Sequence, residues 1–169
     1  MRRTSLRSAL KRAPISYEKS KRSTAYYKSS SAAKQRYADK MQFIVADIVD
    51  GEVTPGNQPF DVLIPETRDA IEVKTLVDNK NSKITMHKES RIRKERFARK
   101  NLLKPHTVAI DARQNFSENW QEAEFSSPDK VFYKKGVGSY YIRSMRPVTP
   151  SQLREAVRSK PRRLIARTS

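Results

Sequence analysis

Two apolar runs near the middle of the chain read Phe60-Asp61-Val62-Leu63-Ile64 and Ala70-Ile71-Glu72-Val73-Lys74-Thr75-Leu76-Val77. Both runs are short and apolar, and each therefore predicts a strand. Only residues 65–69 separate them, and so short a turn favours antiparallel pairing. We expect these two strands to be neighbours in one sheet.

The second run carries charged side chains inside its apolar sequence. Because successive side chains of a strand point to opposite faces, Glu72 and Lys74 share one face while Ile71 and Val73 share the other. We expect one face to pack in the core and the other to form a site, since a carboxylate and an ammonium lose hydration there unless they pair or bind something. Asp61, at the start of the neighbouring strand, brings a second carboxylate beside Glu72.

This arrangement of charges suits metal-dependent chemistry on phosphodiesters. Two carboxylates, with water and phosphate oxygens, provide the hard oxygen ligands that Mg²⁺ prefers, and Mn²⁺ is a substitute. Lys74 would orient or deprotonate an attacking water while the metal offsets charge that develops on phosphorus. The alternative is a partly exposed strand face with a cross-strand ion pair, which contributes little to stability.

The sequence on either side predicts helices around a single sheet. Apolar residues recur at steps of three and four residues before Gly51, which predicts a helix over 31–49. Strands over 130–135 and 139–144 flank Gly136-Val137-Gly138, so we expect a C-terminal hairpin. The order predicts an α+β fold, a mixed α/β sandwich with a single mixed sheet flanked by helices. The other expected elements are a basic helix over 89–102, a buried strand over 106–111 and a short helix over 151–159.

Charge divides the chain into three parts. The 169 residues carry 36 Lys and Arg against 18 Asp and Glu, a formal net charge of +18. Residues 1–40 hold 12 of these basic and 2 of the acidic residues, and residues 151–169 hold 6 and 1. We expect a basic flexible arm over 1–30, which has too little apolar surface to repay ordering, a domain over 31–150 and a basic helix or tail over 151–169. This charge favours a polyanionic partner, and we expect nucleic acid, not a membrane.

Composition excludes several classes of protein. The chain has no cysteine, which excludes a disulfide scaffold, a zinc-thiolate site and a cysteine nucleophile, and its two histidines nearly exclude a multi-histidine metal site. It has no apolar run of the roughly 18 residues that cross a bilayer. It also has no charged start followed by an apolar core and a cleavage site, so we expect a soluble protein that no signal peptide exports.

The spacing of the charged residues resembles a nuclease signature. Asp61 followed, eleven positions later, by Glu72-Val73-Lys74 resembles the signature of the PD-(D/E)XK nuclease superfamily. The resemblance covers about residues 31–111 and implies a restriction-endonuclease-like α-β-β-β-α-β core, with Asp61 and Glu72 as metal ligands and Lys74 as the catalytic lysine. The chain departs from the usual form because Phe60 stands between Pro59 and the acid.

Some members of the superfamily carry a further acid on the first helix. By the same resemblance, Asp47 is the candidate for a third metal ligand, with Asp50 and Asp39 behind it. All three lie on or directly after the helix expected over 31–49.

A narrower resemblance suggests where the chain comes from. It is carried by four stretches that resemble nuclease-like domains of phage proteins, including domains attached to minor head or head-morphogenesis proteins. This resemblance implies a phage or prophage origin, a location in the host cytoplasm or the virion, and phage head proteins as partners. The stretches are residues 71–76, 81–87, 98–100 and 134–140.

Basic residues after the second strand are candidates for nucleic-acid binding. Those of the helix over 89–102 are placed to follow a phosphate backbone, although a solvated helix face offset by Glu89 and Glu95 is the alternative. A histidine just before this helix is near enough to reach a scissile phosphate, although a loop or capping role is the commoner one. The candidates are Lys83, His87, Arg91, Arg93, Lys94, Arg96, Arg99 and Lys100.

Two classes of function remain open. The first is a magnesium-dependent endonuclease that hydrolyses phosphodiester bonds of nucleic acid, with DNA favoured over RNA. The second is a non-catalytic nucleic-acid-binding or virion structural protein that retains a nuclease-like fold. Positive charge suits both classes, and a ribosomal-type RNA binder leaves the embedded acids unexplained. We favour the nuclease because Asp61, Glu72 and Lys74 all have the side chains that its chemistry requires.

Overall fold

The computed structural model describes residues 30–77, 81–113 and 130–158, and the fold is that of these residues. Its helices are α3 (Ser30–Val49), α4 (Lys88–Lys100) and α6 (Pro150–Val157), and a short 3-10 helix covers Ile142–Ser144. Its strands are β1 (Glu52–Val53), β2 (Val62–Ile64), β3 (Asp69–Leu76), β4 (Lys83–Ile84), β5 (Lys104–Asp111), β6 (Lys130–Lys135), β7 (Tyr140–Tyr141) and β8 (Arg146–Pro147).

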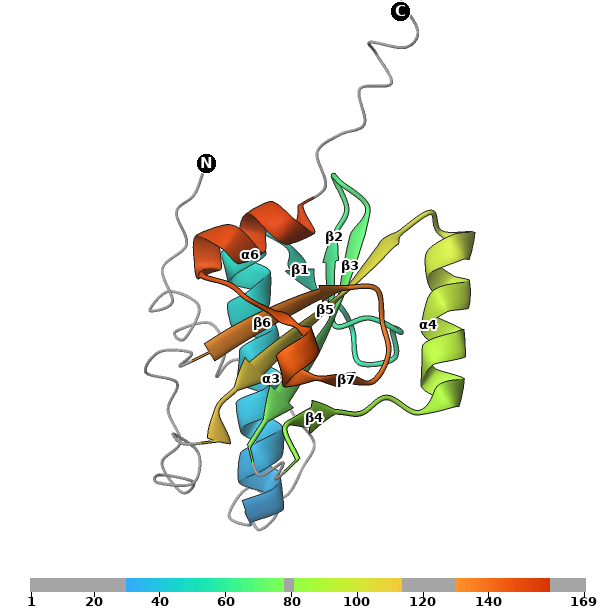
Figure 1. Cartoon of the computed structure of the whole chain (residues 1–169). Helices are drawn as coiled ribbons and strands as arrows, with labels where there is room; N and C mark the ends of the chain where they lie inside the picture. The colour runs from blue at the N-terminus through green and yellow to red at the C-terminus, as the bar shows by residue number, and fades with distance from the viewer. Residues whose placement is uncertain (1–29, 78–80, 114–129, 159–169) are drawn as a thin grey trace, which may run out of the picture.

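The two strands expected from the apolar runs pair as the sequence predicts. β2 runs antiparallel to β3, with Val62 opposite Ile71. On the other side of β3, β5 runs parallel to it, and α4 makes the crossover that parallel neighbours need. The elements α3, β1, β2, β3, α4 and β5 follow the expected α-β-β-β-α-β order. The fold is an α+β sandwich around a six-stranded mixed sheet of order β1-β2-β3-β5-β6-β8 (Figure 1).

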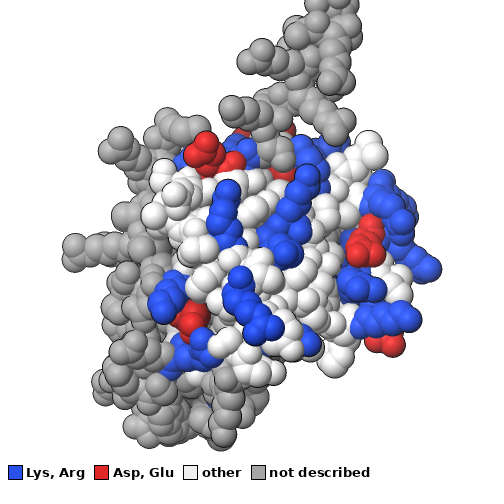
Figure 2. Space-filling view, in the orientation of Figure 1, with Lys and Arg blue, Asp and Glu red and all other residues white. Residues whose placement is uncertain are grey.

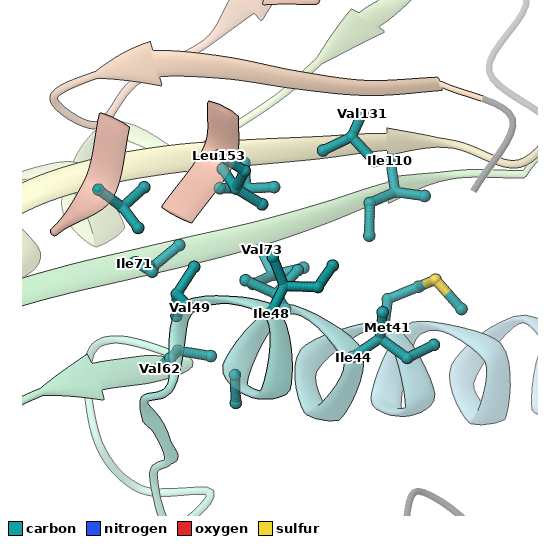
Figure 3. Packing of buried hydrophobic residues seen from close by; sticks show 14 of the residues in the cluster. Met41, Ile44, Ile48, Val49, Val62, Ile71, Val73, Ile110, Val131 and Leu153 are labelled. Carbon is teal, nitrogen blue, oxygen red and sulfur yellow. The ribbon is translucent and has the colours of Figure 1, made fainter. Parts of the chain in front are cut away.

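The main core lies between this sheet and α3. Val73 of β3 and Ile48 of α3 belong to one buried cluster, and Leu153 brings α6 into it (Figure 3). Side chains alternate along β3, so Glu72 and Lys74 lie on the opposite face of the sheet. This confirms the predicted alternation, with Ile71 and Val73 in the main core and Glu72 and Lys74 on the other face of β3.

Two smaller apolar clusters cover that opposite face. One joins Ala70 of β3 to Ala98 of α4. The other joins Leu76 of β3 to Ile84 of β4 and to Ile142 of the 3-10 helix. The charged residues of β3 lie between these two clusters along the strand, with α4 on one side and the β4–β7 pair on the other.

The prediction of a hairpin around Gly136-Val137-Gly138 is wrong. Residues Tyr140 and Tyr141 pair with β4 and form a separate two-stranded sheet, while β6 pairs with β8. Gly136 adopts a positive φ of 90°, which turns the chain out of β6. Tyr140 then packs on the cluster of Leu76 and Ile84. Burial against a strand more than fifty residues earlier outweighs the local turn signal.

The other expected helices and strands are confirmed with small shifts at their ends. β1, β4 and β8 were not predicted from the apolar pattern, because two residues are too few to show a period. The arm expected over 1–30 and the tail beyond residue 158 lie, apart from Ser30, outside the described residues. Among the described helices, none has the length and apolar character needed to cross a membrane.

Candidate active site

Asp61 lies directly before β2, where its carboxylate completes the pairing with β3. Its N–H donates to the carbonyl of Ile71 at 3.0 Å, and its Oδ2 accepts the N–H of Val73 at 2.8 Å. Because Val62 pairs with Ile71, Asp61 is the neighbour of Glu72 across the strand pair. The structure therefore brings the two predicted carboxylates to one place.

Glu72 lies between two lysine ammonium groups. Its residue is 5% exposed, and its Oε1 lies 3.3 Å from Nζ of Lys74. Its other oxygen, Oε2, lies 2.9 Å from Nζ of Lys94 on α4. A buried carboxylate requires such compensation. Of the two lysines, Lys74 has the more exposed side chain, 33% against 12% for Lys94, so Lys74 forms the solvent side of the cluster.

Lys94 is the residue whose position sequence analysis missed. It was expected on the solvent face of the helix as a phosphate contact, but its ammonium points at the sheet. Its Nζ also donates to the carbonyl of Pro59 and lies 5.6 Å from the centre of the Phe60 ring. Lys94 precedes the buried Ala98 by four residues, the spacing that puts two side chains on one helix face. That spacing was the signal that could have revealed its position.

Burial and the charge of Glu72 raise the pKa of Asp61 from 3.8 to about 7. The N–H of Val73 and the ammonium groups of Lys94 and Lys74 oppose this rise, because they favour the ionised form. Burial is the larger cause of the rise, and the charge of Glu72 adds to it, so the Asp61 carboxylate lies near that of Glu72. A divalent cation at this pair would favour the ionised form of Asp61, so the donor set fits Mg²⁺ or Mn²⁺.

The acids expected on or after the first helix are not brought to this pair. Asp47 is buried on α3, which packs on the opposite face of the sheet from Glu72. Asp50 follows the same helix and lies 3.9 Å from Arg154 of α6. Among the described residues, no group of three or more histidine or acidic side chains could hold a metal ion. Within the part of the chain that the structure describes, the candidate metal site consists of Asp61 and Glu72.

The remaining basic candidates of α4 are exposed. Arg91 pairs with Glu95 at 4.0 Å, and Arg93 donates to the carbonyl of Asn57 at 3.2 Å. Figure 2 shows Lys and Arg side chains gathered at the edge of the molecule where α4 lies, with acidic side chains among them. This helix face can contact phosphates close to the carboxylate pair. Its exposed members are Arg91, Arg93, Arg96, Arg99 and Lys100.

Two candidates lie off this helix face. His87 is exposed at the N-cap position of α4, and its side chain makes no capping hydrogen bond. Lys83 lies on β4, where its Nζ is 5.1 Å from the ring centre of Tyr141. The predicted nucleic-acid residues therefore divide between α4 and the β4–β7 sheet, on either side of Lys74.

No family model, no curated protein and no solved structure matches this chain.

Proposed function

We propose that this chain is a magnesium-dependent endonuclease of the PD-(D/E)XK type, phage or prophage encoded, that hydrolyses phosphodiester bonds of nucleic acid, with DNA favoured over RNA. One observation carries the proposal. Asp61, directly before β2, lies beside Glu72 of β3, and Lys74 contacts Glu72 at 3.3 Å on the more exposed side of the cluster. A host-cytoplasmic or virion location and contact with phage head proteins belong to the same proposal.

Each side chain of the cluster has a task in this reaction. Asp61 and Glu72 would hold Mg²⁺, which supplies charge neutralisation at phosphoryl oxygens and lowers the pKa of bound water. Lys74, the more exposed lysine, orients the attacking water and attracts the scissile phosphate. Lys94 holds Glu72 in position from α4, and the exposed arginines of that helix bind neighbouring phosphates.

A cleavage assay with matched variants tests the proposal. The full chain is incubated with duplex, branched and single-stranded DNA, and with RNA, in Mg²⁺ and in a chelator. We expect metal-dependent cleavage that Lys74→Ala and Asp61→Asn each abolish while folding and DNA affinity remain. Lys40→Ala, on the far face of the sheet, is the lysine control and should cleave like the parent. Equal cleavage by the parent and both site variants would come from a contaminating nuclease and would refute the proposal.

A specific observation favours the alternative, a non-catalytic nucleic-acid-binding or virion structural protein. Each charged group of the cluster already has a partner within the protein: Glu72 contacts two lysines, and Asp61 accepts the N–H of Val73. A cluster that serves only to join α4 to the sheet would have its charged groups paired within the protein in this way. The alternative predicts DNA binding without metal-dependent cleavage in the parent, and little change in DNA affinity on Lys74→Ala.

A further inference from the structure

Tyrosine rings and cations alternate on the β4–β7 sheet. The ring of Tyr141 has Nζ of Lys83 at 5.1 Å and Cζ of Arg143 at 4.6 Å from its centre. The ring of Tyr140 has Nζ of Lys134 at 5.2 Å. Lys83, Tyr141 and Arg143 lie together, and we call these three residues the tyrosine–cation surface. Tyr141 is 41% exposed, and only one other large apolar side chain of the described residues is exposed.

The backbone holds Tyr141 facing outward. Lys83 lies opposite Tyr141 and Ile84 lies opposite Tyr140 in the β4–β7 pair. Since Ile84 and Tyr140 pack on the main sheet, alternation directs Lys83 and Tyr141 to the other face of the pair. The hydroxyl of Ser144 donates to the carbonyl of Tyr141 at 2.8 Å, which ties the 3-10 helix to β7. The strand pairing and this hydrogen bond therefore fix the backbone that carries the exposed ring.

The charge of residues 130–147, which include Tyr141 and Arg143, indicates the kind of partner. Between residues 130 and 147 the sequence has five Lys or Arg residues and no Asp or Glu, so a polyanion meets no acidic side chain of this segment. An exposed ring with two cations over it suits a ligand that has both a π-face and a negative backbone. Unpaired nucleotides have both, whereas a duplex hides its base faces inside the stack.

The surface also continues from the candidate active site. The cluster of Leu76, Ile84 and Ile142 seats the β4–β7 sheet on the face of the main sheet that carries Glu72 and Lys74. α4 lies on the same face, at the other side of the carboxylate pair, and Figure 2 shows further Lys and Arg groups across this view. A nucleic acid that crosses Lys74 from α4 therefore meets the tyrosine–cation surface next.

We propose that the tyrosine–cation surface binds an unpaired segment of nucleic acid, with a base stacked on Tyr141 or on the guanidinium of Arg143 and phosphates bound by Lys83 and Arg143. The inference deepens the proposed function, because it names the substrate as nucleic acid with a single-stranded portion, and it rests on that function for the relevance to cleavage. Binding itself requires neither metal nor catalysis.

Binding in a chelator tests the inference without catalysis. Fluorescence anisotropy of the full chain is measured with a labelled oligothymidine of about 16 nucleotides and with a duplex of the same length. Tyr141→Ala should weaken single-strand binding about 5- to 100-fold and duplex binding less than about twofold, because only unpaired bases lose a stacking partner. Tyr141→Phe retains the ring and should bind like the parent. The basic tails are the same in every variant, so their contribution cancels.

Two results would overturn the inference: unchanged oligothymidine binding by Tyr141→Ala, or an equal loss for single strand and duplex. Circular dichroism of Tyr141→Ala confirms folding, and Tyr141→Phe separates loss of the ring from loss of the hydroxyl. If single-strand selectivity depends on Tyr141 but no metal-dependent cleavage occurs, the surface stands and the nuclease proposal fails. If cleavage occurs and Tyr141→Ala binds the single strand like the parent, only the inference fails.

Discussion

Replacement of Asp61 by Asn should remove a pH dependence of stability that this carboxylate causes. Folding raises its pKa from 3.8 to about 7, first through burial and then through the charge of Glu72. The native protein therefore binds more protons than the unfolded chain between about pH 4 and about pH 7. In that window the contribution of Asp61 to stability is present at the acidic end and is lost as the pH rises.

The size of this effect follows from the pKa. One pKa unit corresponds to about 1.4 kcal/mol, so a rise from 3.8 to about 7 corresponds to at most ~4 kcal/mol between the two ends of the window. Asn has the shape of a protonated Asp and keeps an oxygen for the N–H of Val73. The parent and Asp61→Asn should therefore be about equally stable near pH 4. Above about pH 7 the variant should be the more stable protein, by up to ~4 kcal/mol.

Urea unfolding followed by circular dichroism, from about pH 4 to about pH 8, measures this difference. The histidines are the same in both proteins, so their titration cancels. Asp111→Asn is the control with the opposite sign, because hydrogen bonds from Arg113 lower the pKa of Asp111. Its contribution to stability is lost only as the pH falls below about 4, so the difference between the parent and Asp111→Asn should stay constant from about pH 4 to about pH 8. If the difference in free energy of unfolding between the parent and Asp61→Asn does not change with pH, Asp61 is not a buried carboxylate beside Glu72.

Three further predictions concern the same face of the sheet. Addition of Mg²⁺ near neutral pH should release up to about one proton, because a cation favours ionised Asp61. Calorimetry in buffers of different ionisation enthalpy measures the number of protons released, and Asp61→Asn should release fewer. Lys94→Met should lower the free energy of unfolding by about 2 to 3 kcal/mol, because Glu72 then has Lys74 as its one remaining ion-pair partner of the two. The double variant Lys94→Met with Glu72→Gln should lose less stability than the sum of the two single variants. Arg96→Ala and Arg99→Ala should each weaken DNA binding and reduce the slope of log affinity against log salt by about 0.9, and an unchanged slope would exclude that arginine from phosphate contact.

The part of the site that could be predicted from sequence depends on local pattern. Alternation along 70–77 assigned Glu72 and Lys74 to one face, and the short turn at 65–69 required antiparallel pairing. Together these two facts bring Asp61 beside Glu72, because a hairpin register follows from the length of its turn. The helix after β3 and the strand after it were equally evident from their apolar spacing.

Other features depend on contacts between distant segments. Lys94 was expected in solvent, as most helix lysines are, and its ammonium lies on Glu72 because α4 packs its Ala98 face on the sheet. Asp47 has the right side chain for a metal ligand, yet the sheet lies between its helix and Glu72. Neither position can be obtained from spacing along one element, since both depend on which face of the sheet each helix covers.

The alternating pattern of the chain is thus sufficient for the strands, their pairing at β2 and β3, and the placement of Asp61 beside Glu72 and Lys74. Periodicity and turn length act over a few residues, so they can be read directly from the sequence. Packing was required for the pairing of β7 with β4, for the outward ring of Tyr141 and for the second lysine on Glu72. The physical reason is that these features depend on contacts between segments remote in sequence, such as the cluster of Tyr140, Ile84 and Leu76 and the packing of α4 on the sheet. The free energy of that burial does not depend on neighbouring residues in the sequence, so a local pattern does not reveal it.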